Sequence, residues 1–275
     1  MAEGAPAGRF SDPGRHAAAL CRIVQGLVLH EQLGPLHGVA IPAERRAEVH
    51  IRALDEMLDR MLELDPASLD VARPPLRRLV GSCRDYALLL IAMLRAQGCE
   101  ARARCGFAGY FEPGRHVDHW VAEWRRPGGH RWTRLDAELD PGAIAAFAID
   151  LDPLDVPVDR FLDAGTAWTL ARAGALDPDG FGIAGMSGYW FMTGNLLRDL
   201  AALNGVETLP WDCWGAMAAD FETLDAARLA RFDRLAAIVR GTAPDLAACR
   251  AAYAEPGMLV PATVRNAVRG RDEAI

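Results

Sequence analysis

The sequence predicts an α+β protein in which a buried helix precedes an antiparallel sheet. Three observations support this fold class. An apolar run at residues 86–97 is bounded by Ser82 and Gly98, two residue types that are typical of helix ends. The following residues, 99–136, change to the extended patterns of strands. A long and mostly helical stretch then follows Asp140.

The bulk composition excludes several classes of protein. Of the 275 residues, 51% are hydrophobic and 24% are charged, as in ordinary soluble globular proteins. A formal net charge of -7 argues against nucleic-acid binding, which usually requires a basic face. The length fits one large domain or two modest ones. We predict a single domain over 1–275, with an N-terminal helical segment (1–75), a core (76–140) and a helical extension (141–275).

Targeting signals and cysteine usage narrow the possibilities further. The chain starts without the basic residues and apolar run of a secretory signal, and no uninterrupted apolar run is long enough for a membrane span. We therefore expect a cytoplasmic protein with no membrane partner. Its six cysteines include no CxxC pair and are too sparse for a disulfide scaffold, so most are expected to be small buried hydrophobes.

Helical periodicity precedes the core. Residues 1–14 are rich in Gly, Ala and Pro and are expected to form a mobile tail. Apolar residues then recur at helical spacing over 15–33 and over 42–64, and the second helix is expected to begin at its proline. Residues 65–81 are predicted to be a connection broken by paired prolines.

The core begins with the helix that has the clearest boundaries, predicted for residues 83–97. Ser82 and Asp85 stand three apart in a shortened form of the capping box, and Gly98 ends the helix. Strands are then predicted over 99–111, 118–126 and 130–136, with a turn at Pro127-Gly128-Gly129. Further helices are predicted over 156–173, 186–203, 215–239 and 243–253.

Cys83 lies in the first turn of the predicted helix. Unpaired backbone N–H groups and the positive end of the helix dipole favour a thiolate there, so we predict a lowered pKa for this thiol. The thiolate is the form that attacks a carbonyl carbon. On position alone, a core cysteine that happens to begin a helix is an equally good interpretation.

The strands offer partners for this thiol. His119 opens the strand 118–126 and Asp136 closes the strand 130–136, so the turn between them places the two residues roughly opposite one another. Neighbouring strands lie about 5 Å apart, which suits an imidazole–carboxylate hydrogen bond. A structural histidine and a turn aspartate are the better interpretations of each residue alone. All three residues in one arrangement favour a Cys-His-Asp triad.

Three segments carry a family resemblance: GSCRDYALLLIAMLRAQGCEARARCGF (81–107), DHWVAEW (118–124) and RWTRLDAELD (131–140). In this order they resemble the transglutaminase-like superfamily, whose papain-like core packs a nucleophile-bearing helix on an antiparallel sheet. The resemblance covers roughly residues 76–140. It implies that Cys83 is the nucleophile, that His119 is base and then acid, and that Asp136 orients the histidine.

The resemblance extends beyond the core but has limits. The region after the core is similar to a helical extension of bacterial members of the superfamily. The β-sandwich domains and an EF-hand type of calcium loop, expected of animal transglutaminases, cannot be seen in the sequence. The resemblance therefore implies the chemistry of the fold and not protein cross-linking in particular.

Several polar residues have two interpretations. An oxyanion hole would use the backbone N–H of the nucleophile and a second donor, for which Gln32, His37 and Tyr86 are candidates. Arg84 and Arg134 would either hold a substrate carboxylate or be solvated, and surface frequencies favour solvation.

The neighbours of His119 suggest two minor alternatives. Trp120 would either shield the site or pack in the core, and core packing is favoured. A zinc site is a weaker alternative, because its spacing matches no recurrent zinc motif. Its candidate ligands would be His116, Asp118, His119 and His130.

The aromatic segments of the extension offer candidate pocket residues. If the extension covers the cleft, Trp190, Asn195, Trp211 and Trp214 are expected to face it, although core packing is favoured for most of them. Cys213 has no base near it in the sequence and is expected to be inert.

Two functional hypotheses follow. The favoured one is thiol-dependent acyl transfer or hydrolysis at a peptide, amide or acyl-thioester carbonyl, through a covalent acyl-enzyme and without metal or organic cofactor. The alternative is a catalytically silent module that binds a peptide or protein. Retention of all three triad residues favours the enzyme.

Overall fold

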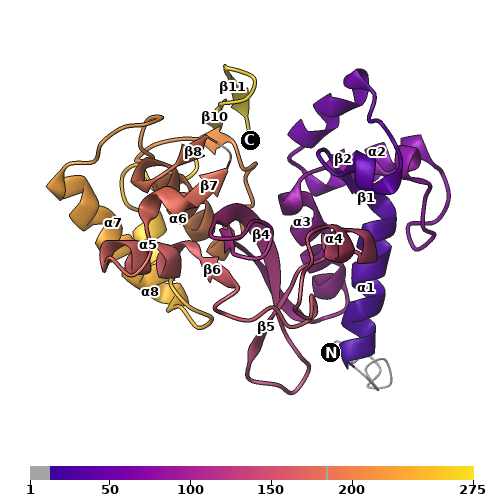
Figure 1. Cartoon of the computed structure of the whole chain (residues 1–275), viewed down its shortest axis with the longest axis horizontal. Helices are drawn as coiled ribbons and strands as arrows, with labels where there is room; N and C mark the ends of the chain where they lie inside the picture. The colour runs from indigo at the N-terminus through magenta and orange to yellow at the C-terminus, as the bar shows by residue number, and fades with distance from the viewer. Residues whose placement is uncertain (1–12, 184) are drawn as a thin grey trace, which may run out of the picture.

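The computed structural model describes residues 13–183 and 185–275, so residues 1–12 of the expected tail lie outside the described part. A β-sheet lies between two groups of helices, one from each end of the chain (Figure 1). This mixed architecture confirms the predicted α+β class. Among the described residues, no helix is both long and apolar enough to cross a membrane.

Three consecutive antiparallel strands form the centre of the sheet, as predicted. They are β3 (Glu100–Ala108), β4 (His116–Arg125) and β5 (Trp132–Leu135). Gly128, in the turn between the last two, has a φ of 74°, which glycine adopts at little cost. Three short strands extend the sheet in the order β6-β3-β4-β7-β8: β6 (Phe161–Asp163), β7 (Phe181–Ile183) and β8 (Met186–Ser187).

Alternation along β3 explains its mixture of small and basic residues. Ala101 and Cys105 are buried in one hydrophobic cluster with helix α3 (Cys83–Ala96), and their small side chains let the helix pack closely on the sheet. Because side chains alternate along a strand, Arg102 and Arg104 lie on the opposite face. That face is covered by the C-terminal helices, so these two arginines are buried as well.

A buried ionic network joins this face of the sheet to the C-terminal region. Arg104 is fully buried and donates two 2.8 Å hydrogen bonds to Asp199. Glu123 accepts from Arg134 at 3.0 Å on one oxygen and approaches Arg104 at 3.4 Å with the other. Three guanidinium groups and three carboxylates take part in the network, from Arg102, Arg104, Arg134, Glu123, Asp163 and Asp199.

The expectation that Arg84 and Arg134 are solvated is wrong. Each is only 2% exposed. Arg134 belongs to the ionic network, and Arg84 pairs with Asp85 at 2.9 Å while donating to the backbone carbonyl of Glu207. Both guanidinium groups therefore bind partners within the protein and not solvent, although Nε of Arg84 is buried without a hydrogen-bond partner.

The N-terminal region packs against the outer side of α3. The predicted helix over 42–64 is wrong in its middle, since the chain is extended around Arg52. The Arg52 side chain pairs with Asp212 at 2.7 Å and its carbonyl accepts a hydrogen bond from Arg84, so tertiary contacts fix this break. The elements are α1 (Pro13–Leu27), β1 (Val28–His30), η1 (Gly34–His37), η2 (Ala43–His50), α2 (Leu54–Leu64), η3 (Pro75–Arg77) and β2 (Leu79–Gly81), with β1 parallel to β2.

The C-terminal region is less helical than predicted. The helix expected over 156–173 begins only at Ala164, because the three residues before it pair with β3, and the helix expected over 215–239 begins at Ala226. The end of the chain forms an unpredicted hairpin. The elements are α4 (Pro141–Ala146), α5 (Ala164–Arg172), η4 (Pro178–Gly180), α6 (Tyr189–Leu203), β9 (Asp212–Cys213), α7 (Ala226–Val239), α8 (Leu246–Tyr253), β10 (Thr263–Asn266) and β11 (Arg271–Ala274).

Candidate active site

Cys83 is the first residue of α3, where the sequence places it. Ser82 precedes the helix with extended backbone, and its N–H donates a 2.8 Å hydrogen bond to the Asp85 side chain. This is the capping-box arrangement expected from the sequence. Residues in the first turn of a helix have backbone N–H groups without intrahelical partners, so the Cys83 N–H is placed to bind an oxyanion.

His119 and Asp136 meet at one end of the sheet. Nε2 of His119 lies 2.8 Å from Oδ2 of Asp136, and both side chains are 2% exposed or less. The last residue pair between β4 and β5 is Ala122 with Leu135, so Asp136 lies just beyond the paired strand. The two residues are diagonal neighbours and not opposite each other. The expected hydrogen bond is present, although the register differs from the expected one by two residues.

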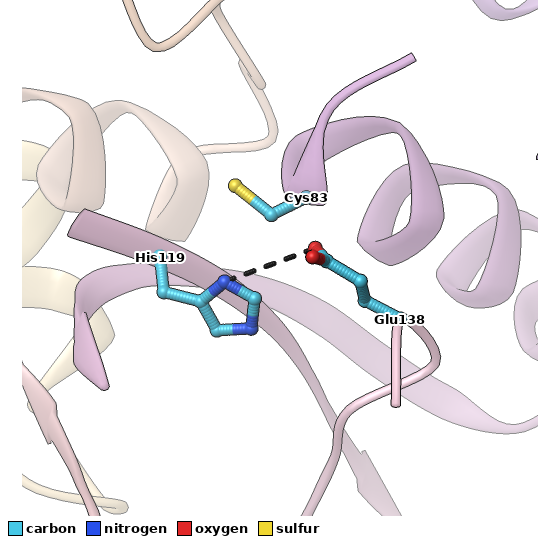
Figure 2. A group of neighbouring side chains, drawn as sticks. All are labelled: Cys83, His119 and Glu138. Carbon is cyan, nitrogen blue, oxygen red and sulfur yellow. Dashed lines mark ion pairs between the residues drawn. The ribbon is translucent and has the colours of Figure 1, made fainter. Parts of the chain in front are cut away.

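Cys83 lies on the other side of the imidazole. One ligand atom from each of Cys83, His119 and Glu138 lies within 4.8 Å of the others, and the nearby His119 acts to lower the thiol pKa. Figure 2 shows the sulfur pointing away from Glu138 and lying near the ring of His119. Since Nε2 is bound to Asp136, Nδ1 is the nitrogen left to exchange a proton with the thiol.

The predicted lowering of the Cys83 pKa is wrong. Burial raises the pKa of Cys83 to about 11, and the nearby His119 only partly opposes this rise. Burial alone would lower the pKa of His119, but the Asp136 carboxylate outweighs it and raises this pKa well above its usual value. Both shifts favour the protonated pair, a neutral thiol with an imidazolium ion. It has to lose one proton before it can act as nucleophile and base.

Two further side chains, Tyr110 and Glu138, lie against this pair, and neither was predicted as a site residue from the sequence. The hydroxyl of Tyr110 donates a 2.6 Å hydrogen bond to Oδ2 of Asp136, which fixes the carboxylate. Glu138 places Oε2 4.0 Å from Nδ1 of His119, and that oxygen is buried without a hydrogen-bond partner. Residues 137 and 138 form a turn after β5, in which the Glu138 N–H donates a 3.1 Å hydrogen bond to Oδ1 of Asp136, so Glu138 lies beside the triad.

A cavity of about 230 Å³ opens onto the thiol and the imidazole. Of the three candidate oxyanion donors, Gln32 lines this cavity. The hydroxyl of Tyr86 is instead bonded to the backbone of Val28 and His30, and His37 pairs with Asp140 at 3.4 Å. Gln32 is therefore the better placed of the three. Other lining residues include Ser82, Phe111, Glu112, Val117, Asp118, Glu138, Phe147, Ile183 and Pro210.

The zinc ligands suggested by the sequence do not come together. His116 stacks on Phe181 with ring centroids 4.6 Å apart, and His130 lies exposed near the β4–β5 turn. Among the described residues, the group that could hold a metal ion is Cys83, His119 and Glu138. A thiolate, an imidazole and a carboxylate are ligands that zinc accepts, so a metal here would occupy the thiol itself.

The aromatic residues of the extension divide into two sets. Trp190 and Trp211 line a second cavity beside the first, whereas Trp214 is buried and donates to the carbonyl of Met258. Asn195 is fully buried and donates a 2.8 Å hydrogen bond to Asp118. Trp120 is 1% exposed and packs in the core with α3, as favoured from the sequence.

A thiol at a helix start, with an imidazole and a carboxylate at the end of an adjacent sheet, defines the class of papain-like Cys-His-Asp sites. The family model of the transglutaminase-like superfamily matches residues 56–137, which contain all three groups. The chain thus carries a transglutaminase-like domain. The match begins within α2, earlier than the predicted core at residue 76. No curated protein and no solved structure matches the chain.

Proposed function

We propose that this protein is a thiol enzyme that transfers or hydrolyses acyl groups at amide or thioester carbonyls. The observation that carries the proposal is the grouping of Asp136, His119 and Cys83: Nε2 of His119 is bound to the carboxylate, and the thiol lies within 4.8 Å of the imidazole. Each group has the role that covalent catalysis requires: a nucleophile, a proton carrier and an orienting acid.

The first half-reaction forms an acyl-enzyme. After the pair loses one proton, the Cys83 thiolate attacks the carbonyl carbon and a C–S bond forms. The backbone N–H of Cys83 and the Gln32 amide hold the oxyanion. His119 then gives its Nδ1 proton to the leaving nitrogen or sulfur as the bond between this atom and the carbonyl carbon breaks.

The second half-reaction releases the acyl group. Neutral His119 removes a proton from water or an amine, which attacks the thioester, and the C–S bond breaks to regenerate the thiolate. Water yields a carboxylic acid and an amine yields a new amide. The triad serves both outcomes, so the acceptor is decided by what enters the cavity.

An acyl-donor assay with a competing acceptor tests the function. We expect p-nitrophenyl acetate to release p-nitrophenolate faster with the protein than with Cys83→Ala, while Cys99→Ser, a buried cysteine outside the cavity, keeps the wild-type rate. Glycine ethyl ester is then added as an acceptor, and the amounts of its N-acetyl product and of acetate are compared. The first product reports transfer and the second reports hydrolysis. Equal rates for the wild-type protein and Cys83→Ala would contradict the proposal.

One observation favours the alternative function, a catalytically silent module that binds a peptide or protein. Burial raises the pKa of Cys83 to about 11, which leaves little thiolate at neutral pH. In that case the protein would bind its ligand in the cavity without acylation of Cys83 at any pH. The same assay, repeated up to pH 10, separates the two functions.

A further inference from the structure

The C-terminal region builds a second cavity of about 340 Å³ beside the cavity that contains the thiol. This volume lies within the usual range for small-molecule sites. Apart from Asp118, the residues that line it all follow residue 182 in the sequence. They come from β7 and β8, from α6, from the segment 210–220 and from the hairpin at the end of the chain. The transglutaminase-like core therefore does not form this cavity by itself.

The walls of this second cavity are mainly apolar. Trp190, Phe191, Trp211 and Met217 are only partly buried, although such side chains are normally packed in a core. Their surfaces therefore remain available to an apolar ligand. The remaining lining residues are Asp118, Ile183, Met186, Gly194, Arg198, Pro210, Cys213, Ala218, Asp220, Ala267 and Val268.

Hydrogen bonds hold the walls in place. The indole N–H of Trp211 donates to Nδ1 of His50 at 3.0 Å, which ties this wall to the N-terminal region. The backbone N–H of Ala218 donates to the Thr193 hydroxyl at 2.9 Å, so the segment after β9 is fixed to α6. Because the walls of this cavity are already fixed, a ligand that fills it loses little binding free energy to the ordering of side chains.

The two cavities share a border formed by Asp118, Ile183 and Pro210. Asp118 directly precedes His119, and its carboxylate is held by Asn195, which in turn accepts a 3.1 Å hydrogen bond from Arg198. Cys83 and His119 line the first cavity, which meets the second cavity at this border. A ligand bound through its carbonyl at the thiol can thus extend past Asp118 into the second cavity.

We propose that the second cavity binds the apolar acyl group of the substrate, so that acyl donors with a medium-length aliphatic or aromatic acyl group are preferred. This inference rests on the proposed function, because it assumes that an acyl group reaches Cys83. The leaving group then lies on the side of Nδ1 of His119, which supplies its proton. The C-terminal extension is the part of the chain that selects the substrate.

The test measures Cys83 acylation by p-nitrophenyl acetate and p-nitrophenyl hexanoate, followed by intact mass and peptide mapping. Each ester has the same leaving group, and each rate is divided by that ester's rate with N-acetylcysteine. The cysteine thioester forms as p-nitrophenolate leaves. We expect the normalised hexanoate rate to exceed the acetate rate by about tenfold or more, since buried methylene groups discriminate by at least this much.

Two variants test whether the preference for hexanoate over acetate arises in the second cavity. Ile183→Trp narrows the border between the cavities, and Val268→Asp puts a charge at the cavity wall; these side chains are 37% and 66% exposed, so the fold tolerates the changes. Both are expected to reduce the hexanoate-to-acetate ratio at least fivefold. The control Leu62→Trp, at a 43% exposed position on α2, is expected to keep the wild-type ratio.

The outcomes separate this inference from the function on which it rests. If neither ester acylates Cys83, the proposed function itself fails. If both esters acylate Cys83 with equal normalised rates, or if the variants keep the wild-type ratio, the apolar subsite is refuted while acyl transfer at Cys83 stands. Thermal unfolding of each variant identifies any loss of ratio that comes from misfolding.

Discussion

Asp136 binds Nε2 of His119 at 2.8 Å from a position just beyond the last paired residue of β5. Backbone pairing between β4 and β5 therefore does not fix the position of the Asp136 carboxylate. Tyr110 fixes it instead through a 2.6 Å hydrogen bond. With one ring nitrogen occupied in this way, His119 has its other nitrogen toward Cys83. This single hydrogen bond sets the tautomer and the orientation on which the proposed chemistry depends.

Asp136→Asn is expected to slow acylation of Cys83 by about 10²- to 10⁴-fold, because the amide cannot stabilise the imidazolium. The carboxylate is also the main group that raises the His119 pKa, so this pKa is expected to fall in the variant. Stopped-flow acylation and a histidine NMR titration measure the two effects. The control Asp150→Asn removes a carboxylate that is 75% exposed, and it is expected to change neither. If Cys83 is acylated at the wild-type rate in Asp136→Asn, the Asp136–His119 pair does not have the proposed role.

The rate at which iodoacetamide labels Cys83 is expected to keep rising as the pH approaches 11. The pKa of Cys83 is raised to about 11, so the thiolate fraction is small at neutral pH and grows as pH increases. Glu138 is one of the charges that raise this pKa, so Glu138→Gln is expected to label faster at pH 8. Glu112→Gln, at a 54% exposed side chain of the same cavity, is the control. A labelling plateau below pH 8 in the wild-type protein would contradict the raised pKa.

Gly106→Ala is expected to destabilise the protein by about 1–3 kcal/mol, as overpacked sites usually do. A Cβ at this position would lie 2.2 Å from the carbonyl oxygen of Leu162, on the neighbouring strand β6. Gly106 is also the residue of β3 that pairs with His119 on β4, so the strain arises on the strand beside the base. Chemical denaturation measures the loss, and Gly180→Ala is the control because its nearest atom would lie 4.0 Å away. Equal stability of the two variants would show that the sheet adjusts freely.

Arg104→Met is expected to cost about 3–5 kcal/mol of stability, because it leaves the buried carboxylate of Asp199 without its charged partner. Glu123 keeps its bonds to Arg102 and Arg134. Arg131→Met breaks an ion pair whose arginine is 67% exposed, and a change of no more than about 1 kcal/mol is expected. Urea unfolding of the two variants measures the difference. Similar losses in both would mean that the buried network contributes no more than a surface pair.

The elements that the sequence predicts well are those with local signals. Helix α3 is bounded by Ser82 and Gly98, and its apolar run is continuous, so its start is found to the residue. The strands β3 to β5 are long enough to show alternation and are separated by a glycine turn. These elements hold Cys83 and His119, which explains why the arrangement of the site was predictable.

The features that the sequence misses depend on distant contacts. Strands β6 and β7 have three residues each, too few for a periodic pattern, and they are strands because β3 and β4 pair with them. The Cys83 pKa follows the depth of burial, which no local pattern reports. Arg84 and Arg134 are indistinguishable from surface arginines in the sequence, because their carboxylate and carbonyl partners come from several separate segments.

The most direct test of the central claim is the mass of the protein after a short incubation with p-nitrophenyl acetate at pH 9, followed by acid quenching. We expect one acetyl group per chain, mapped to the peptide that contains Cys83. Cys83→Ala is expected to acquire none, and His119→Ala far less than the wild-type protein. Acetylation spread over the other cysteines, or a wild-type mass unchanged at every time point, would contradict a nucleophilic Cys83.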